Sequence, residues 1–79
     1  MIYLASPYTN HNPATRMRNF KSAARCAHWL SERGEIVFSP IVYGHALSTV
    51  VDVPTDWEYW AETDKFFISL CSEILVLTL

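Results

Sequence analysis

The amino-acid sequence predicts an α/β domain with a short parallel sheet. Three short apolar runs, typical of strands buried on both faces, occupy residues 2–5, 36–38 and 74–77. Segments with helical patterning separate them. Strands that alternate with helices form parallel sheets with right-handed crossovers, and an open, doubly wound arrangement places the first strand in the middle. We therefore expect residues 1–79 to form one three-layer domain in the order β-α-β-α-β.

The first strand, Ile2-Tyr3-Leu4-Ala5, is closed by Ser6-Pro7 and a polar loop. Asn12 followed by Pro13 favours a helix start, because Asn caps free amides and proline has the φ angle of the first helical position. Gly34 is the expected helix end, since glycine readily takes the left-handed conformation found there. The residues that recur at helical spacing between these ends are Arg16, Phe20, Ala23, Ala27 and Leu30.

The second half of the chain repeats this alternation. Residues 36–38 predict a second strand, and the irregular segment 41–53 predicts a loop with room for one helical turn. A helix is expected to restart at residues 54–56, where Thr55 or Asp56 would cap it. Its one-sided stripe comprises Trp57, Trp60, Asp64, Ile68 and Cys71. Residues 74–77 form the third expected strand.

Composition restricts the classes of partner. Of the residues, 51% are hydrophobic and 18% are charged, so we expect a second subunit to cover apolar surface in a homo-oligomer. The net charge of −2 argues against binding a nucleic-acid polymer. The basic residues nonetheless gather in the first half and the acidic residues in the second, and one interpretation is two solvated helix faces of opposite sign.

The sequence predicts a cytoplasmic protein. Cys26 and Cys71 have no metal or redox spacing, so buried free thiols in a reducing compartment are expected. The N-terminus lacks the pattern of a signal peptide. No run approaches the ~20 apolar residues of a membrane span, so no membrane association is expected.

The expected ligand site lies beyond the carboxyl ends of the strands, where doubly wound sheets bind ligands. This places Ser6, Pro7 and Tyr8 beside residues 78–79. Hydroxyls and free amides in such a loop suit a sugar or a phosphate group, although an ordinary turn remains the alternative. The loop has neither a Walker motif nor a dinucleotide fingerprint, and we expect no cofactor.

Asp64 is the most informative candidate, because its helical stripe carries a carboxylate toward the apolar side. Desolvating a charged carboxylate is unfavourable without compensating partners. Asp64 could instead cap a backbone segment, pair with an arginine or lie at the edge of the stripe. We favour contact with a ligand, since perturbed carboxylates cluster in functional sites.

Four further residues are weaker ligand-binding candidates. Arg16 could hold a phosphate or carboxylate, although a solvated arginine is the commoner case. Ser39 and His45 follow the second strand and could line the crevice, and Trp57 could stack on a base or belong to the core. The three histidines share no metal-ligand spacing, so no metal site is expected.

These motifs together resemble a family. The segments concerned are Ile2-Tyr3-Leu4-Ala5-Ser6-Pro7-Tyr8, Phe38-Ser39-Pro40-Ile41, His45, Asp56-Trp57-Glu58-Tyr59-Trp60 and Asp64. Over essentially the whole chain they resemble short prokaryotic and phage proteins of uncharacterised function, placed beside the nucleoside 2-deoxyribosyltransferases. The resemblance implies a flavodoxin-like or Rossmann-like fold and a site for a nucleoside or a related molecule.

Those transferases exchange bases on a 2-deoxyribose through a covalent glycosyl intermediate on a glutamate. The resemblance matches Asp64 to the acidic residue that their third helix directs into the site, and matches Ser6 and Tyr8 to the loop bordering the sugar. In the family, a Gly-Trp turn and a helix with the nucleophilic glutamate follow the third strand. This sequence ends at Leu79, so the expected domain corresponds to the N-terminal half of the family fold and lacks that motif.

Three functions stay open on this evidence. The first is a protein that binds a nucleoside or nucleotide without the complete machinery for turnover. The second is an enzyme that transfers or hydrolyses the N-glycosidic bond, with Asp64 or Glu58 as the catalytic carboxylate. The third is a truncated remnant or a module for protein interaction. We rank binding first.

Overall fold

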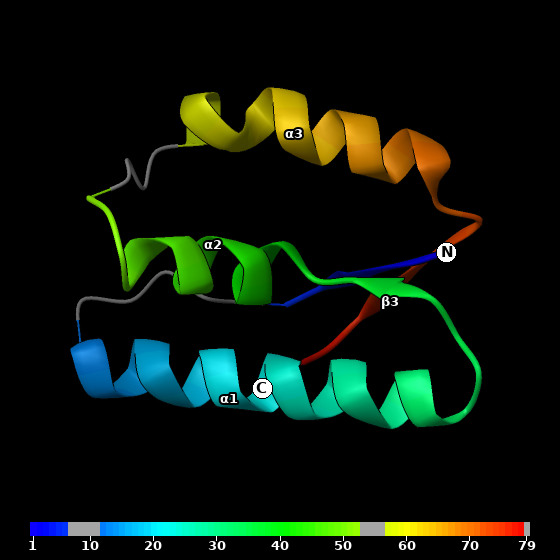
Figure 1. The fold of residues 1–79 in the computed structure, drawn as a ribbon, viewed down its shortest axis with the longest axis horizontal. Helices are drawn as coiled ribbons and strands as arrows, with labels where there is room; N and C mark the ends of the chain where they lie inside the picture. The colour runs from blue at the N-terminus through cyan, green and yellow to red at the C-terminus, as the bar shows by residue number, and fades with distance from the viewer. Residues whose placement is uncertain (7–11, 53–56, 79) are drawn as a thin grey trace.

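A computed structural model describes residues 1–6, 12–52 and 57–78. The strands are β1 (Ile2–Ala5), β2 (Val37–Phe38) and β3 (Glu73–Val76), and the helices are α1 (Pro13–Glu32), α2 (Pro40–Ser48) and α3 (Trp57–Leu70). The sheet separates α1 on one face from α3 on the other, which gives three layers (Figure 1). The predicted α/β fold class is confirmed.

The sheet is parallel and has the order β2-β1-β3, so the first strand lies in the middle as predicted. Tyr3 is in register with Phe38 of β2 and with Ile74 of β3. Residues in register on parallel strands face the same side of a sheet. Because the Phe38 ring stacks on Phe67 of α3 at 3.9 Å, Tyr3 and Ile74 face α3, and Leu4 faces α1.

Both predicted ends of α1 are confirmed. The Asn12 side chain accepts a hydrogen bond from the Ala14 amide at 2.9 Å, and Pro13 is the first helical residue. At the other end Gly34 has a φ angle of +88°. The amides of Gly34 and Glu35 donate to the carbonyls of Ser31 and Leu30, which is the Schellman pattern. On the predicted stripe Ala23 and Leu30 are buried.

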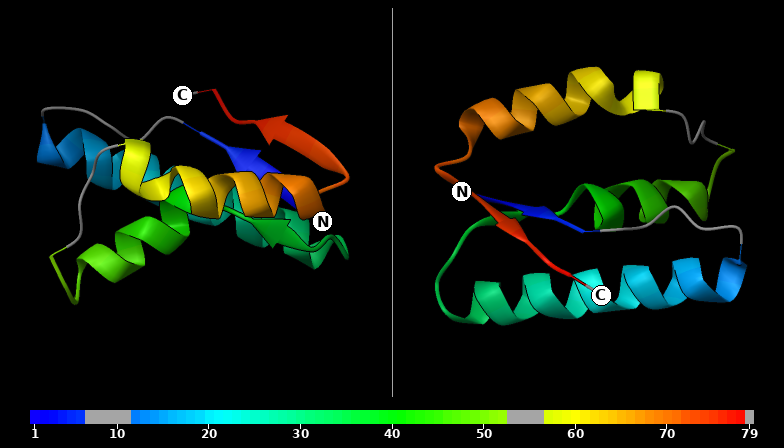
Figure 2. Two further views of the ribbon diagram at one scale, coloured as in Figure 1. Left: turned by 90° about the horizontal axis from the view of Figure 1, so that it is seen from above. Right: turned by 180° about the vertical axis from the view of Figure 1, so that it is seen from behind.

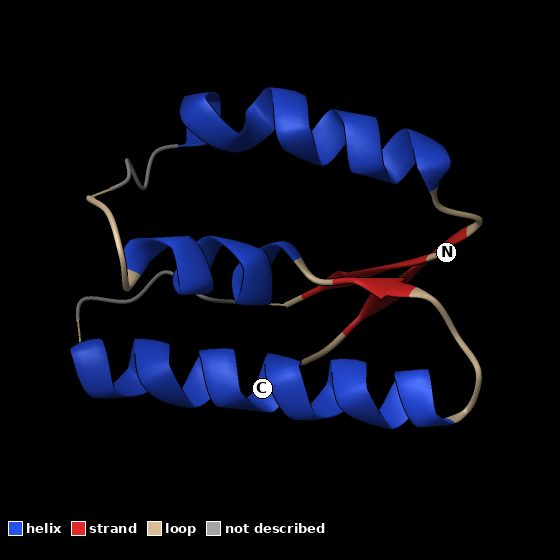
Figure 3. Ribbon diagram, viewed as in Figure 1, coloured by secondary structure: helices blue, strands red, loops and turns tan. Residues whose placement is uncertain are grey.

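The expectation of a loop over residues 41–53 is wrong, because α2 occupies Pro40–Ser48 (Figure 3). Ser39 and Pro40 start this helix as Asn12 and Pro13 start α1: Ser39 Oγ accepts from the Val42 amide at 3.2 Å. The helix is apolar on several sides, so no one-sided stripe marked it in the sequence. It continues beyond the end of β2 and lies between α1 and α3 (Figure 1).

Contacts of α3 correct part of its predicted stripe. Trp60 packs against α2: its ring atoms lie 3.9 Å from the position that a Cβ would take if Gly44 were alanine. Phe67 reaches β2, whereas Ile68, which the stripe placed inward, is exposed. The predicted caps Thr55 and Asp56 lie outside the described residues. The buried core is small and centres on β1: it comprises Ile2, Tyr3, Leu4, Ala23, Leu30 and Ala61.

Candidate functional site

The carboxyl ends of the three parallel strands lie at one edge of the sheet. Ser6 follows β1, Ser39 follows β2, and Leu77 and Thr78 follow β3. The Leu77 amide donates to the Ala5 carbonyl at 2.8 Å, so β1 and β3 stay paired up to this edge. This is the edge at which the sequence predicts the ligand site.

Ser6 presents a hydroxyl group that the described part of the chain does not use. Ser6 is half-buried, and its Oγ atom is shielded from solvent and has no hydrogen-bond partner in the described structure. A buried polar atom without a partner is unfavourable unless another group reaches it. The Ser6 hydroxyl at the end of β1 therefore requires a partner from outside the described residues to be satisfied. The neighbouring candidates Pro7 and Tyr8 lie outside the described residues.

Asp64 lies half-buried on α3, on the side of the helix that carries Trp60 and Phe67. Burial raises the pKa of the Asp64 carboxyl above its ordinary value of 3.8. The carboxyl is thus held in partly apolar surroundings, where its charged form is disfavoured, and perturbed carboxyls of this kind cluster in functional sites.

Tyr3 joins Asp64 under α3, and sequence reasoning missed it. The Tyr3 residue is buried. Burial raises the pKa of its phenol most, and the charges of Asp64 and Cys71 raise that pKa further. The two acidic groups are therefore close enough to influence one another's charge. The sequence did contain a signal, because Tyr3 is a hydroxyl-bearing aromatic residue within an otherwise aliphatic strand. Strand patterning alone does not distinguish such a residue from an ordinary core residue.

Most of the remaining candidates lie on or next to α1 and α2. The His45 ring stacks on Phe20 of α1 with centroids 3.9 Å apart and planes 19° apart. Arg16 is half-buried one helical turn before Phe20. Ser39 is buried and caps α2. Trp57 begins α3, and its side chain is not among those described. Of the predicted candidates, Arg16, Ser39 and His45 thus lie on or next to α1 and α2, Asp64 lies on α3, and Ser6 lies at the end of β1.

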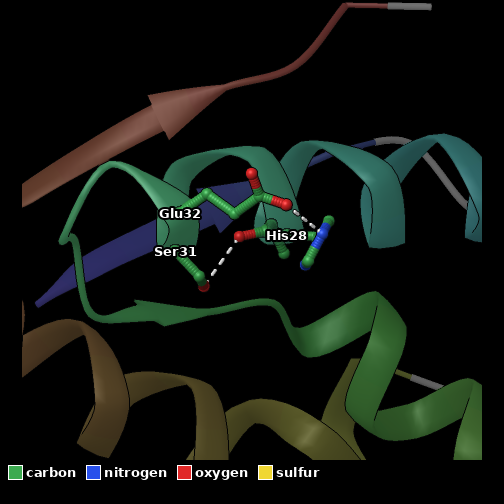
Figure 4. A network of polar contacts seen from close by, with 4 residues as sticks. His28, Ser31 and Glu32 are labelled. Atoms are coloured by element: carbon green, nitrogen blue, oxygen red, sulfur yellow. Dashed lines mark hydrogen bonds and ion pairs between the residues drawn. The ribbon is translucent and has the colours of Figure 1, made fainter.

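The outer face of α1 makes local polar contacts. The His28 imidazole contacts the Glu32 carboxylate one turn later, and Ser31 Oγ donates to the Ala27 carbonyl at 2.9 Å (Figure 4). The Arg33 guanidinium lies 4.1 Å from the centre of the Trp29 ring. The three other exposed basic residues on this face are Arg18, Lys21 and Arg25. These contacts fit the interpretation of a solvated helix face.

The described residues contain no group of three or more His, Cys, Asp or Glu side chains arranged to hold a metal ion. None of their helices has the length and apolar character needed to cross a membrane.

The model of one protein family, described as Domain of unknown function (DUF1937), matches residues 1–79. The chain belongs to this family. Comparison with curated proteins and with solved structures gives no match. The family description assigns no chemistry, so a function for this member has to be inferred from the individual properties of Ser6, Tyr3 and Asp64.

Proposed function

We propose that this protein binds a nucleoside or nucleotide, in a site made by the Asp64 carboxyl, the Tyr3 phenol and the end of β1 at Ser6. The proposal includes a relationship to the nucleoside 2-deoxyribosyltransferases, which the sequence motifs suggest. The observation that carries it is the half-buried Asp64 carboxyl, which lies close enough to the buried Tyr3 phenol for its charge to raise the pKa of that phenol.

The chemistry of a sugar suits these groups. A carboxylate accepts hydrogen bonds from the hydroxyls of a ribose or deoxyribose, and bonds to a charged group are stronger than neutral ones. Donors from a bound sugar would replace the water that Asp64 loses on burial. The unpartnered Ser6 hydroxyl would supply a further contact beyond the carboxyl end of the central strand. A parallel sheet with the first strand in the middle binds its ligands beyond these strand ends.

Ligand-observed NMR tests the proposal directly. The purified chain is mixed with 2′-deoxynucleosides, ribonucleosides and their phosphates, and saturation transfer to the sugar protons identifies what binds. Asp64→Asn should weaken binding by about tenfold or more, through loss of a charged hydrogen-bond acceptor. Glu62→Gln is the matched control, because Glu62 is exposed on the same helix. Absence of transfer from every compound, or equal binding by both variants, would overturn the proposal.

Cleavage of the glycosidic bond is a second candidate, which the raised pKa of Asp64 favours. A carboxyl that keeps its proton at higher pH is better suited to protonate a departing base. The same NMR samples test this, since free base would appear over time as new signals. Base release that Asp64→Asn abolishes and Glu58→Gln preserves would make Asp64 the acid. Binding without base release would leave the protein as a binding module.

A further inference from the structure

Strand β3 is the most apolar exposed element of the described structure. It pairs with β1 along one side only, and no other described element lies beyond it (Figure 2, left). Ile74, Leu75 and Val76 are all exposed, although they alternate between the two faces of the sheet. Unpaired strands of this kind are usually protected by lysine, proline or a covering element. Within β3 the one charged residue is Glu73.

Further exposed apolar residues lie at the end of α3, just before β3 in the sequence. Phe66, Ile68 and Leu70 are exposed, and they precede β3 directly in the sequence. The stretch 66–76 thus carries six of the thirteen large hydrophobic residues that are exposed in the described chain. Apolar groups concentrated in one region, rather than scattered singly, mark an interaction surface.

The backbone of β3 has a defined pattern of free hydrogen-bonding groups. The Leu77 amide donates to Ala5 of β1, so Leu77 directs its backbone groups inward. Successive residues of a strand alternate in direction, so Leu75 also directs its groups toward β1. At the start of the strand the Ser72 amide donates to the Met1 carbonyl at 2.9 Å. Ile74 and Val76 therefore direct their N–H and C=O groups toward the open side.

We propose that a second copy of this chain occupies the open side of β3. The two β3 strands then pair antiparallel, and the two-fold axis that relates the copies passes between their Leu75 residues. Ile74 then pairs with Val76 of the second copy through backbone hydrogen bonds. Leu75 faces Leu75 of the second copy in a pair without hydrogen bonds. In this arrangement the α3 helices of both copies cover the same face, so the two sheets join into a single sheet of six strands.

A second copy matches this strand in both charge and polarity. In the proposed register the charged Glu73 lies opposite Leu77 of the second copy, so the two Glu73 carboxylates do not meet. The other pairs join apolar residues to apolar residues, which is the favourable arrangement for cross-strand neighbours. A two-fold interface must be complementary to itself, and this strand satisfies that requirement in hydrogen bonding, polarity and charge.

Analytical ultracentrifugation over a range of concentrations gives the first test, with a dimer expected for the wild-type chain. Leu75→Lys should raise the dimer dissociation constant at least about tenfold, because two ammonium groups would face each other across the axis. Val50→Lys should leave it unchanged, since Val50 is exposed elsewhere, at 83%. Circular dichroism confirms that each variant is folded. A monomeric wild-type chain, or a Leu75→Lys dimer as tight as wild type, would refute the proposal.

Cysteine cross-linking tests the register independently. In a chain carrying Cys26→Ala and Cys71→Ala, Leu75→Cys should form a disulfide-linked dimer with copper phenanthroline, because residues in such a pair lie ~4.5 Å apart at Cα. Ile74→Cys should cross-link poorly, since the two copies of residue 74 are diagonal neighbours ~7–8 Å apart. Equal cross-linking at both positions would contradict the proposed two-fold axis.

Discussion

Strands β1 and β3 look alike in the sequence but have opposite environments in the fold. Each is a four-residue strand with a run of large apolar side chains, and Leu4 and Leu75 are partners in the same ladder. Leu4 is 0% exposed, whereas Leu75 is 39% exposed. The difference arises because β1 has a strand on each side, whereas β3 has one neighbour among the described strands. An apolar run therefore predicts a strand, whereas its burial depends on its place in the sheet.

Substitution of the two paired leucines gives the largest expected difference. Leu4→Ala should lower the free energy of unfolding by about 3–5 kcal/mol, because it leaves a cavity in a closely packed core. A domain of this size has little stability to lose, so this variant should be largely unfolded at 25 °C. Leu75→Ala should lower it by less than about 1 kcal/mol.

Urea denaturation followed by circular dichroism measures both variants. The samples should be dilute enough to be monomeric, since a dimer would add its own stabilisation to the wild-type chain. Equal losses for Leu4→Ala and Leu75→Ala would mean that β3 is as buried as β1, and the contrast between the strands would fail.

The two glycines extend the comparison to identical residues in different backbone conformations. Gly34 has a φ angle of +88° at the end of α1, in the region that side chains disfavour. Gly34→Ala should therefore lower the free energy of unfolding by about 1 kcal/mol. Nothing lies within 4 Å of the added Cβ, so the loss would reflect backbone strain alone. A neutral effect in the same denaturation assay would show that the helix ends differently.

Gly44→Ala should have the opposite sign. Gly44 lies inside α2, where an added Cβ would make ordinary contact with the Trp60 ring at 3.9 Å. Alanine is the better helix former, so the free energy of unfolding should rise by up to about 1 kcal/mol. Thermal unfolding measures it as a higher Tm. A lower Tm would indicate that α2 and α3 pack more closely than this contact implies.

The smallest expected difference is between Asp64 and Glu62, which lie on different faces of α3, and it concerns how stability depends on pH. Burial raises the pKa of Asp64 in the folded state, so the folded chain binds more protons than the unfolded chain at pH values above 3.8. Stability therefore falls as pH rises from 3.8 through the folded pKa, relative to a residue that does not titrate. Asp64→Asn should match wild type below pH 3.8 and be slightly more stable at pH 7.

Exposed Glu62 gives the matched control for this effect. Glu62→Gln should follow the wild-type dependence of Tm on pH, with any difference close to the error of the measurement. If Asp64→Asn were less stable than wild type at pH 7, the Asp64 carboxylate would have to make a stabilising contact within the fold.

Much of the fold was predictable because its signals are local. Asn12 with Pro13, and Gly34, mark the ends of α1 through backbone chemistry that depends on few neighbours. The loop expected at residues 41–53 was wrong because α2 packs between two other helices and needs no one-sided pattern. The predicted stripe on α3 was partly wrong because Phe67, rather than Ile68, stacks on Phe38 of β2.

The candidate site was predictable only in part, because it depends on contacts between distant segments. Asp64 was recognisable from its place on an apolar stripe. The raised pKa of Tyr3 depends on burial and on the charges of Asp64 and Cys71, which come from distant segments that no local pattern brings together. Ser6 was expected from its position after β1, and its unpartnered hydroxyl became evident in three dimensions.

The shortness of β2 has a consequence for assembly. This strand is only two residues long, and the chain turns directly into α2 at its end. A border with so few backbone groups offers little for another strand to pair with. Growth of the sheet from its described strands is therefore favoured on the β3 side. In the dimer proposed above, both remaining borders are short β2 strands, so we expect assembly through this sheet to stop at two chains and not to propagate into a fibre.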